Sequence, residues 1–398
     1  MANDDDIGEL EITDELIAER NAFTPGETPD DMTPWMRPIV AGIDVLNLWV
    51  GRIACVLVVP IIAVMVIEVV SRKVFLAPTD YSYEFSRMLS GALFMLAAGY
   101  GLMRGVHIRA DFIYRNWSRQ TQMTVDTILY LAFYFPSMLF FLWVSYEFTF
   151  KAWINWERSM DTAMMAPLAP ARTAMPICAA LLLLQGISEV LKSLYEMTEG
   201  RRRTFLKLLP FYIGGLTLIF LGVVFPETVP VGSWWTSLIG TTPIAALSPQ
   251  MIGVVMICVM LFSIFVGFPI SFTLIFLSFV FGAWGFGAKL SFYLQTFQFN
   301  ATMLDDQLVA VPLFVFMGIL MEKAGLMERL FSAIQQLAAG VRGSLFIAVL
   351  FVSMIFAAAT GIVGASVTIL GIMAARTMNK SGYDVRLAAG SITAGGTL

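Results

Sequence analysis

The sequence IFAAATGIVGASVTILGIM, residues 355 to 373, decides how the last third of this chain folds, and it lies within an apolar run from residue 344 to residue 378. Eight of the ten residues from 357 to 366 are Ala, Gly, Ser or Thr. A straight helix needs about 20 residues to cross the hydrocarbon core of a bilayer, so this run is too long for one straight crossing. We therefore expect the helix to tilt, break or turn back. The stretch from Thr360 to Gly364 is the expected place, because its glycines weaken the helix.

Two interpretations of this small-residue stretch remain open. Broken backbone at membrane depth persists only within protein or beside a cavity, and transporters place ion and substrate sites at such breaks. Small residues also line ordinary helix crossings, where they let two backbones approach closely without any role in transport. A second stretch of the same kind, AAGSITAGGTL at residues 388 to 398, favours the cavity.

The composition is that of a membrane protein. Hydrophobic residues make up 58% of the chain and charged residues only 14%, whereas soluble domains carry roughly 25% charged residues. Residues 1 to 31 hold eleven acidic residues and one basic residue, so the remainder is mildly basic. We expect an all-α polytopic membrane protein with an acidic, disordered tail over residues 1 to 40.

The distribution of Arg and Lys predicts the topology. Four spans are expected at about residues 45 to 70, 85 to 103, 123 to 146 and 173 to 194, and a fifth at about 208 to 225. The loop after the second span and the segment after the fourth are rich in arginine, whereas residues 226 to 250 contain no Lys or Arg. The positive-inside rule then places the N-terminus in the cytoplasm and residues 226 to 250 outside.

The domains expected from this order are a tail (1–40), a four-span unit (41–203), a connecting span with an external loop (204–248) and a second unit (249–398). The second unit opens with two spans around Gly267-Phe268-Pro269. Pro312 then interrupts a short apolar run, which predicts a re-entrant hairpin. Residues 326 to 341 have one apolar face and should lie along the interface. A hairpin, a horizontal helix and a broken span together indicate the first half of an elevator-type inverted-repeat carrier.

The chemistry available to the chain is limited. His107 is the only histidine, and no zinc-protease, CxxC or phosphate-binding-loop motif is present, so we expect neither an enzyme nor an ATP-driven pump. Glu68 and Arg72 are expected to form a surface pair. Asp305-Asp306 could be cation ligands but fit better as helix caps. Hydroxyls and carbonyls of the broken segments are better ligands for a hard cation such as Na+.

Four longer strings resemble one transporter family. GYGLMRGVHIRADFIYRNWS (99 to 118) resembles the hallmark of the small membrane subunit of TRAP transporters, the tripartite ATP-independent periplasmic carriers. VPLFVFMGILMEKAGLMERLF, IFAAATGIVGASVTILGIMAARTM and GYDVRLAAGSITAGGTL resemble the large subunit. The likeness covers about residues 40 to 398. It implies a fused small and large permease of the bacterial inner membrane, importing organic acids with a Na+ gradient after capture by a periplasmic solute-binding protein.

The resemblance also implies Na+ as the coupling ion, with neither a resident cofactor nor a nucleic-acid partner. It implies ion- and substrate-binding residues in two segments. The residues are Thr360, Gly361, Gly364 and Ser366 in the first segment, and Ser391, Thr393, Gly395, Gly396 and Thr397 in the second. The chain departs from the family around Glu84, where small subunits usually carry a Trp and paired acids. Family large subunits also continue into a second, inverted half, so we expect a truncated large subunit. The alternative function is a non-transporting membrane scaffold or assembly subunit.

Overall fold

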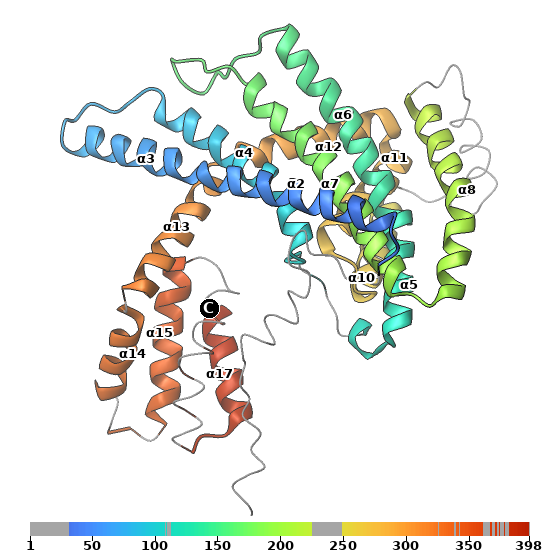
Figure 1. Ribbon diagram of the computed structural model, residues 1–398. Coiled ribbons are helices and arrows are strands. Elements are labelled where there is room, and N and C mark those ends of the chain that lie inside the picture. Colours follow the sequence, from blue (N-terminus) through green and yellow to red (C-terminus); the bar gives the residue numbers. More distant parts are fainter. Residues whose placement is uncertain are drawn as a thin grey trace, which may run out of the picture. The chain divides into compact units, whose positions relative to one another are not determined.

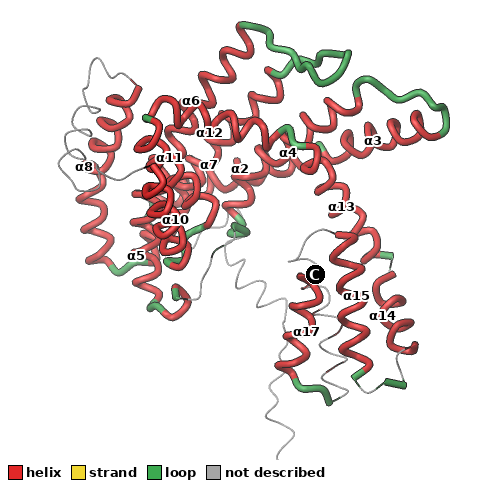
Figure 2. The backbone as a smooth tube through the Cα atoms, turned by 180° about the vertical axis from the view of Figure 1, so that it is seen from behind, coloured by secondary structure: helices red, strands yellow, loops and turns green. Residues whose placement is uncertain are grey.

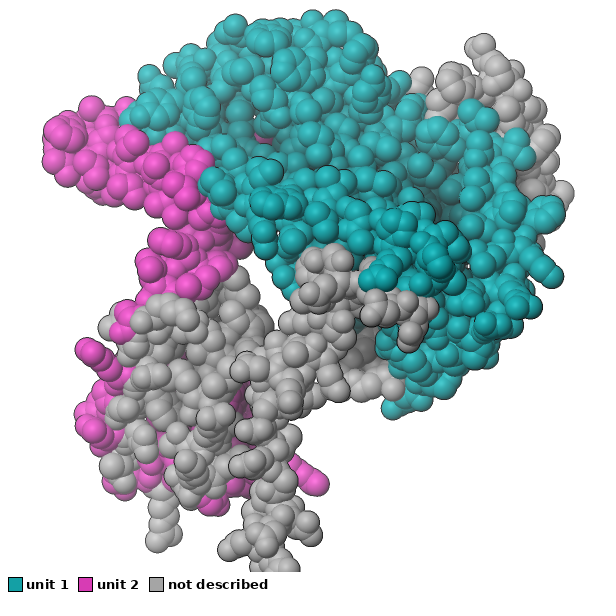
Figure 3. Space-filling view, in the orientation of Figure 1, with its two compact units in different colours: residues 1–57, 79–303 teal, residues 58–78, 304–398 magenta. Residues whose placement is uncertain are grey.

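The computed structural model describes residues 32–107, 109, 113–224, 249–324, 326–337, 340–341, 343–360, 367, 371, 374, 378 and 382–397. Over these residues the structure is helical and contains no β-strand, which confirms the predicted all-α class (Figure 1, Figure 2). The chain forms two compact units, residues 1–57 with 79–303 and residues 58–78 with 304–398 (Figure 3). The domain limits expected from the sequence stay a prediction.

The first unit is a bundle of helices. Its helices are α2 (Met36–Val56), α4 (Ser82–Met103), α5 (Arg119–Leu129), α6 (Phe135–Ile154), α7 (Ala169–Glu196), α8 (Glu199–Val224), α10 (Pro249–Phe265), α11 (Ile270–Phe286) and α12 (Ala288–Met303). A 3-10 turn, η1 (Tyr114–Asn116), precedes α5, and a π-helical turn, η2 (Tyr130–Tyr134), joins α5 to α6. The helix α7 packs against α2, α4 and α6, so it forms the centre of the unit.

Aromatic rings fill the core around α7. Tyr130 and Tyr134 of η2 are almost completely buried, and Tyr134 Oη donates a hydrogen bond of 2.5 Å to the carbonyl oxygen of Leu182. Gly186 leaves room for the Tyr134 ring, since a Cβ there would lie 2.3 Å from Cε1 of that ring. The absence of a side chain on α7 therefore fixes how closely η2 can approach it.

A proline inside α7 creates a second link to α6. Pro176 cannot donate to the carbonyl oxygen of Arg172 four residues earlier. Thr149 Oγ1 of α6 donates to that carbonyl instead, at 3.0 Å, and Thr149 is buried. The cost of leaving a carbonyl unpaired in an apolar bundle is thereby avoided.

Four described helical stretches are long and apolar enough to cross a membrane, or five if one pair of consecutive helices counts as a single span. They are Met36–Lys73, Arg119–Ile154, Ala169–Glu196 and Glu199–Leu221. They coincide with the first, third, fourth and fifth expected spans. The second expected span corresponds to α4, which is not among the four. The first stretch is divided at Leu57 into α2 and α3 (Val58–Lys73), because Pro60 cannot donate to the carbonyl of Val56.

The second unit contains α3, α13 (Asp306–Lys323), α14 (Leu326–Leu337), α15 (Ser344–Thr360) and α17 (Val385–Thr397). The helix α13 continues through Pro312, so the apolar run is not broken at that residue, and the expected re-entrant hairpin stays a prediction. The loss of one N–H donor is smaller than the loss from ending the helix at that point.

Two local predictions in this unit are confirmed. Asp305 caps α13, since its Oδ1 accepts a hydrogen bond of 2.8 Å from the backbone N–H of Gln307. Arg72 Nε donates to Glu68 Oε1 at 2.8 Å, so the expected pair forms, although Glu68 is buried rather than at the surface. In α14, Leu330 and Ile334 pack on the α15 cluster, but Leu337, expected on the same apolar face, is 87% exposed. Whether α14 lies in the membrane interface stays a prediction.

Candidate functional site

The helices α15 and α17 form the core of the second unit and carry the two small-residue segments. Buried side chains of α15 (Leu345, Ala348, Val349 and Val352) meet Ala388 and Ile392 of α17. The Tyr383 ring, just before α17, contacts the Phe346 ring near the start of α15, with centroids 4.9 Å apart. Further along both helices Gly395 lies against Ser353. The two helices therefore run in the same direction.

The closest approach of the pair is at Gly395. A Cβ at this position would lie 1.8 Å from Ser353 Oγ and 3.5 Å from the Cα of Leu350, so only glycine fits without movement. Ser353 is fully buried, and its hydroxyl donates to the carbonyl of Val349 at 2.6 Å. Gly395 thus acts here as the small residue of a helix crossing.

The described hydroxyls of α17 bond to their own helix. Ser391 Oγ donates to the carbonyl of Ala388 at 2.8 Å, and Thr393 Oγ1 donates to the carbonyls of Ala389 and Gly390 at 3.0 Å. Each hydroxyl uses its proton in this bond and keeps lone pairs that can accept. Ser391 is partly buried, whereas Thr393 is exposed, so the two hydroxyls point to different faces of α17.

The structure places the expected site residues unequally. Ser391 and Gly395 share the face of α17 that meets α15, and Gly396 and Thr397 are in the last turn of α17. Thr360 is the last residue of α15. Because the helices are parallel, these residues lie toward the same end of the pair. The remaining expected residues, Gly361, Gly364 and Ser366, lie outside the described residues.

A buried polar network joins α2 to α7 in the first unit, and sequence reasoning missed it. Lys192 Nζ lies 2.9 Å from both Asp44 Oδ2 and Glu189 Oε1. Ser188 Oγ donates to Asp44 Oδ1 at 2.8 Å, and Gln185 Nε2 donates to the same oxygen at 3.1 Å. The spacing of Gln185, Ser188 and Lys192 puts all three on one face of a helix, which is the signal that could have revealed them.

The arginine-rich loop after α4 contacts the turn between α10 and α11. Arg109 forms an isolated backbone bridge with Pro269, and its Nη1 lies 3.1 Å from Asp126 Oδ2. Tyr114 Oη donates to the same carboxylate oxygen at 2.8 Å. Gly267 has a positive φ of 92°, and a Cβ there would lie 2.6 Å from Tyr114 Cβ. The loop after α4 therefore packs closely against the turn between α10 and α11.

Glu84 has a defined role within its own chain. It is only 2% exposed, and its carboxylate accepts hydrogen bonds from the backbone N–H groups of Thr162 at 3.0 Å and Ala166 at 2.8 Å. These bonds hold the loop between α6 and α7 to the start of α4.

Comparison with known protein families gives two matches. Residues 61–196 match the DctQ component of the tripartite ATP-independent periplasmic transporters, and residues 255–398 match the DctM component. The chain belongs to the TRAP transporter permeases. It carries the small and the large permease components in one chain, which confirms the resemblance drawn from its sequence, and this family consists of transport proteins rather than enzymes.

Curated relatives come from three bacteria. The C4-dicarboxylate TRAP transporter large permease protein DctM of Vibrio cholerae is 35% identical over 133 residues, 33% of this chain and 29% of the relative. The sialic acid TRAP transporter permease protein SiaT of Haemophilus influenzae is 22% identical over 359 residues, 88% of this chain and 53% of the relative. DctM of Pseudomonas aeruginosa is 35% identical over 91 residues, which are 23% of this chain and 21% of the relative. The chain thus spans at most about half the length of these relatives.

Proposed function

We propose that this chain is the membrane permease part of a Na+-coupled secondary transporter that imports organic acids delivered by a periplasmic solute-binding protein. The observation that carries the proposal is the presence of DctQ and DctM components in one membrane chain. The names of the relatives support the substrate class, because C4-dicarboxylates and sialic acids both carry carboxylate groups.

The second unit supports the proposed coupling to Na+. A hard cation prefers oxygen ligands, and in transporters these come from hydroxyls and freed backbone carbonyls near breaks in helices. In the parallel pair, α15 ends at Thr360 and α17 carries Ser391, whose hydroxyl oxygen keeps lone pairs that can accept a cation. We place the ion and substrate region there, together with Gly361, Gly364 and Ser366.

We further place the permease in the bacterial inner membrane with the N-terminus in the cytoplasm. The arginines of the loop after α4 and of the segment at the start of α8 support this orientation, because positive loops stay inside. In the elevator that we propose, the first unit is the fixed scaffold and the small-residue helices of the second unit move.

The proposal is tested by uptake. The permease containing this sequence is reconstituted in proteoliposomes with a solute-binding protein from the same genome and a radiolabelled C4-dicarboxylate or sialic acid, over a series of Na+ gradients. We expect uptake that needs both the binding protein and Na+. Uptake that is equal without Na+, or none with any carboxylate and cognate binding protein, would favour the scaffold alternative.

A variant pair locates the ion site. Ser391→Ala should raise the Na+ concentration needed for half-maximal uptake, because one oxygen ligand is lost. Thr302→Val is the matched control, since its hydroxyl also bonds its own helix, at the Gln298 carbonyl, but lies in α12. If both variants shift the Na+ dependence equally, Ser391 is not an ion ligand.

A further inference from the structure

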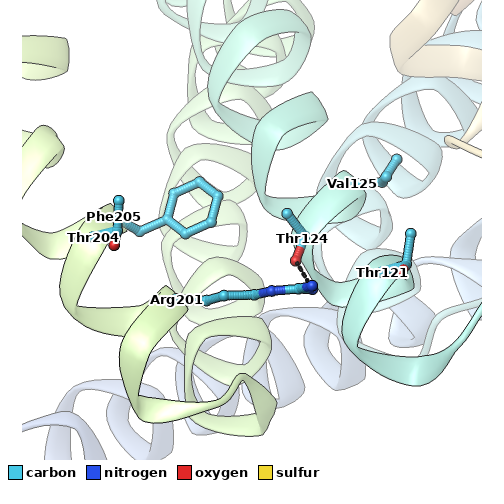
Figure 4. A pocket seen from close by; sticks show the side chains of 6 residues that line it. All are labelled: Thr121, Thr124, Val125, Arg201, Thr204 and Phe205. Atoms are coloured by element: carbon cyan, nitrogen blue, oxygen red, sulfur yellow. Dashed lines mark hydrogen bonds between the residues drawn. The ribbon is translucent and has the colours of Figure 1, made fainter.

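A pocket of about 420 Å³ lies between α5 and the first turns of α8, within the first unit (Figure 4). Its lining comes from both helices: Thr121, Thr124 and Val125 of α5, and Arg201, Thr204 and Phe205 of α8. In Figure 4 the Arg201 side chain reaches from α8 toward Thr124, while the Phe205 ring points into the same space. The pocket therefore combines one cation, three hydroxyls and an apolar wall.

Arg201 is held in place but its charge is not neutralised. Its Nη1 lies 3.1 Å from both the Gln120 carbonyl oxygen and Thr124 Oγ1, which accept hydrogen bonds from it. No carboxylate among the described residues lies within ion-pair distance of it. The other arginines nearby are paired: Arg119 lies 2.5 Å from Glu196 and Arg203 lies 3.4 Å from Glu199. Arg201 therefore keeps a positive charge that an anion can neutralise.

Two threonine hydroxyls beside Arg201 are held by their own helices, and Thr124 in turn helps to hold Arg201. Thr204 Oγ1 donates to the Gly200 carbonyl at 3.0 Å, and Thr124 Oγ1 donates to the Gln120 carbonyl at 2.7 Å, so both are fixed in position. A guanidinium group offers several N–H donors in one plane and binds the oxygens of a phosphate well. Phe205 and Val125 add an apolar surface that a free inorganic ion would not use.

The position of the pocket points to a lipid. It lies where the basic start of α8 gives way to apolar residues that face outward, among them Leu208 at 57%, Phe211 at 81% and Ile213 at 53% exposure. In the candidate membrane span of α8 no residue is fully buried inside the protein. Such a helix is covered by acyl chains, and basic pockets at this depth meet lipid headgroups.

We propose that this pocket binds the phosphate of an anionic membrane phospholipid. Arg201 neutralises the phosphate, Thr124 and Thr204 stand beside it, and the glycerol and first methylenes pack on Phe205. The acyl chains continue along α8. Besides the bonds of Arg201, the hydrogen bond from Tyr212 Oη to the Leu131 carbonyl and the packing of Phe205 and Leu206 on the core hold α8 in this region. The lipid would therefore act as an additional link between α8 and α5.

Thermal unfolding of the purified full chain in detergent tests the proposal. Phosphatidylglycerol, phosphatidylcholine or inorganic phosphate is titrated in, and the midpoint of unfolding is recorded. We expect phosphatidylglycerol to raise the midpoint more than the other two additives. Arg201→Gln should lower the apparent affinity for phosphatidylglycerol at least about fivefold, because one basic residue near an anionic surface contributes a factor of about that size.

Two comparisons decide the outcome. Arg203→Gln is the matched control, because it removes the same charge from the same helix outside the pocket and should keep the phosphatidylglycerol response. Thr124→Val is a second pocket variant. It removes an acceptor that holds Arg201 in place, so it should also weaken the response, and it serves as the test if Arg201→Gln does not fold. Equal losses in Arg201→Gln and Arg203→Gln, or an unaltered response in Thr124→Val and Arg201→Gln, would overturn the proposal. Equal stabilisation by inorganic phosphate would show an ion site rather than a lipid site.

Discussion

Replacing Gly267 with alanine should destabilise the turn between α10 and α11. Gly267 has φ of 92°, a conformation that residues with a Cβ rarely adopt, and its Cβ would lie 2.6 Å from Tyr114 Cβ and 2.8 Å from Tyr114 Cγ. The first of these contacts is with an atom next to the backbone, which cannot rotate away. The arginine-rich loop would have to move off the turn, and Arg109 would lose its backbone bridge to Pro269.

The size of the effect follows from two terms. A non-glycine residue in a left-handed conformation costs about 1–2 kcal/mol. Extra atoms forced into a close-packed site cost about 1–3 kcal/mol. The free energy of unfolding should therefore fall by about 2–5 kcal/mol for Gly267→Ala, a large part of the roughly 5–15 kcal/mol that stabilises a typical protein.

A matched control and a double mutant make this prediction specific. Gly253 lies within α10 with no atom within 4 Å of its Cβ position, so Gly253→Ala should be neutral or stabilise by about 0.5–1 kcal/mol. Tyr114→Gly removes the clashing Cβ, so Gly267→Ala should cost less in that background. Equilibrium unfolding in mixed micelles of sodium dodecyl sulfate and a mild detergent is measured for the unchanged chain, the three single variants and the double mutant. If Gly267→Ala is as stable as Gly253→Ala, or if its cost is unaltered by Tyr114→Gly, the loop does not rest on this turn.

Three further outcomes are expected. Gly395→Ala should lower the free energy of unfolding by about 1–3 kcal/mol, because the new Cβ would lie 1.8 Å from the Ser353 hydroxyl oxygen of α15. Gly390→Ala is the control, because its Cβ would meet no atom and stability should not fall. Equal effects of the two substitutions would disprove the close crossing. Lys192→Met should cost about 3–5 kcal/mol, because it leaves the buried Asp44 carboxylate without its cation; a loss under about 1 kcal/mol, as for an exposed pair, would contradict a buried network. Burial, together with repulsion from Arg109, lowers the pKa of His107 below its ordinary 6.5. The unfolded chain therefore takes up a proton at this histidine at a higher pH than the folded chain does, and stability should fall as the pH drops below about 6.5. The His107→Gln variant should lose part of that pH dependence of the unfolding midpoint. An identical dependence in this variant would contradict a lowered pKa for the half-buried His107.

Local features of this protein were predictable because they depend on neighbours in sequence. Long apolar segments predicted the helices, and four of the expected spans match candidate spans in the structure. The cap at Asp305 and the pair of Glu68 with Arg72 were predictable for the same reason, since each involves residues within one turn. Pro312 shows the limit of such rules, because the rest of α13 outweighs one unfavourable residue.

The candidate site was predictable only in part. The sequence identified small residues in two segments, and the structure shows that Gly395 and Ser391 lie on one face of α17 while Thr393 is exposed on another. Glycine and serine suit both a close helix crossing and an ion site, so composition alone cannot separate the two roles. Only the position of Ser353 opposite Gly395 assigns a packing role to that glycine.

The sequence by itself determined that this is a helical membrane permease of the TRAP family, where its helices lie, and which segments are rich in small residues. The tertiary structure decided which polar groups inside the bundle meet. Lys192 forms an ion pair with Asp44, which is 148 positions away in the sequence. Thr149 donates a hydrogen bond to the carbonyl that Pro176 leaves without a partner, and Arg201 donates one to Thr124 on another helix. A hydrogen bond or ion pair acts over a few ångströms, and only packing brings such distant residues that close.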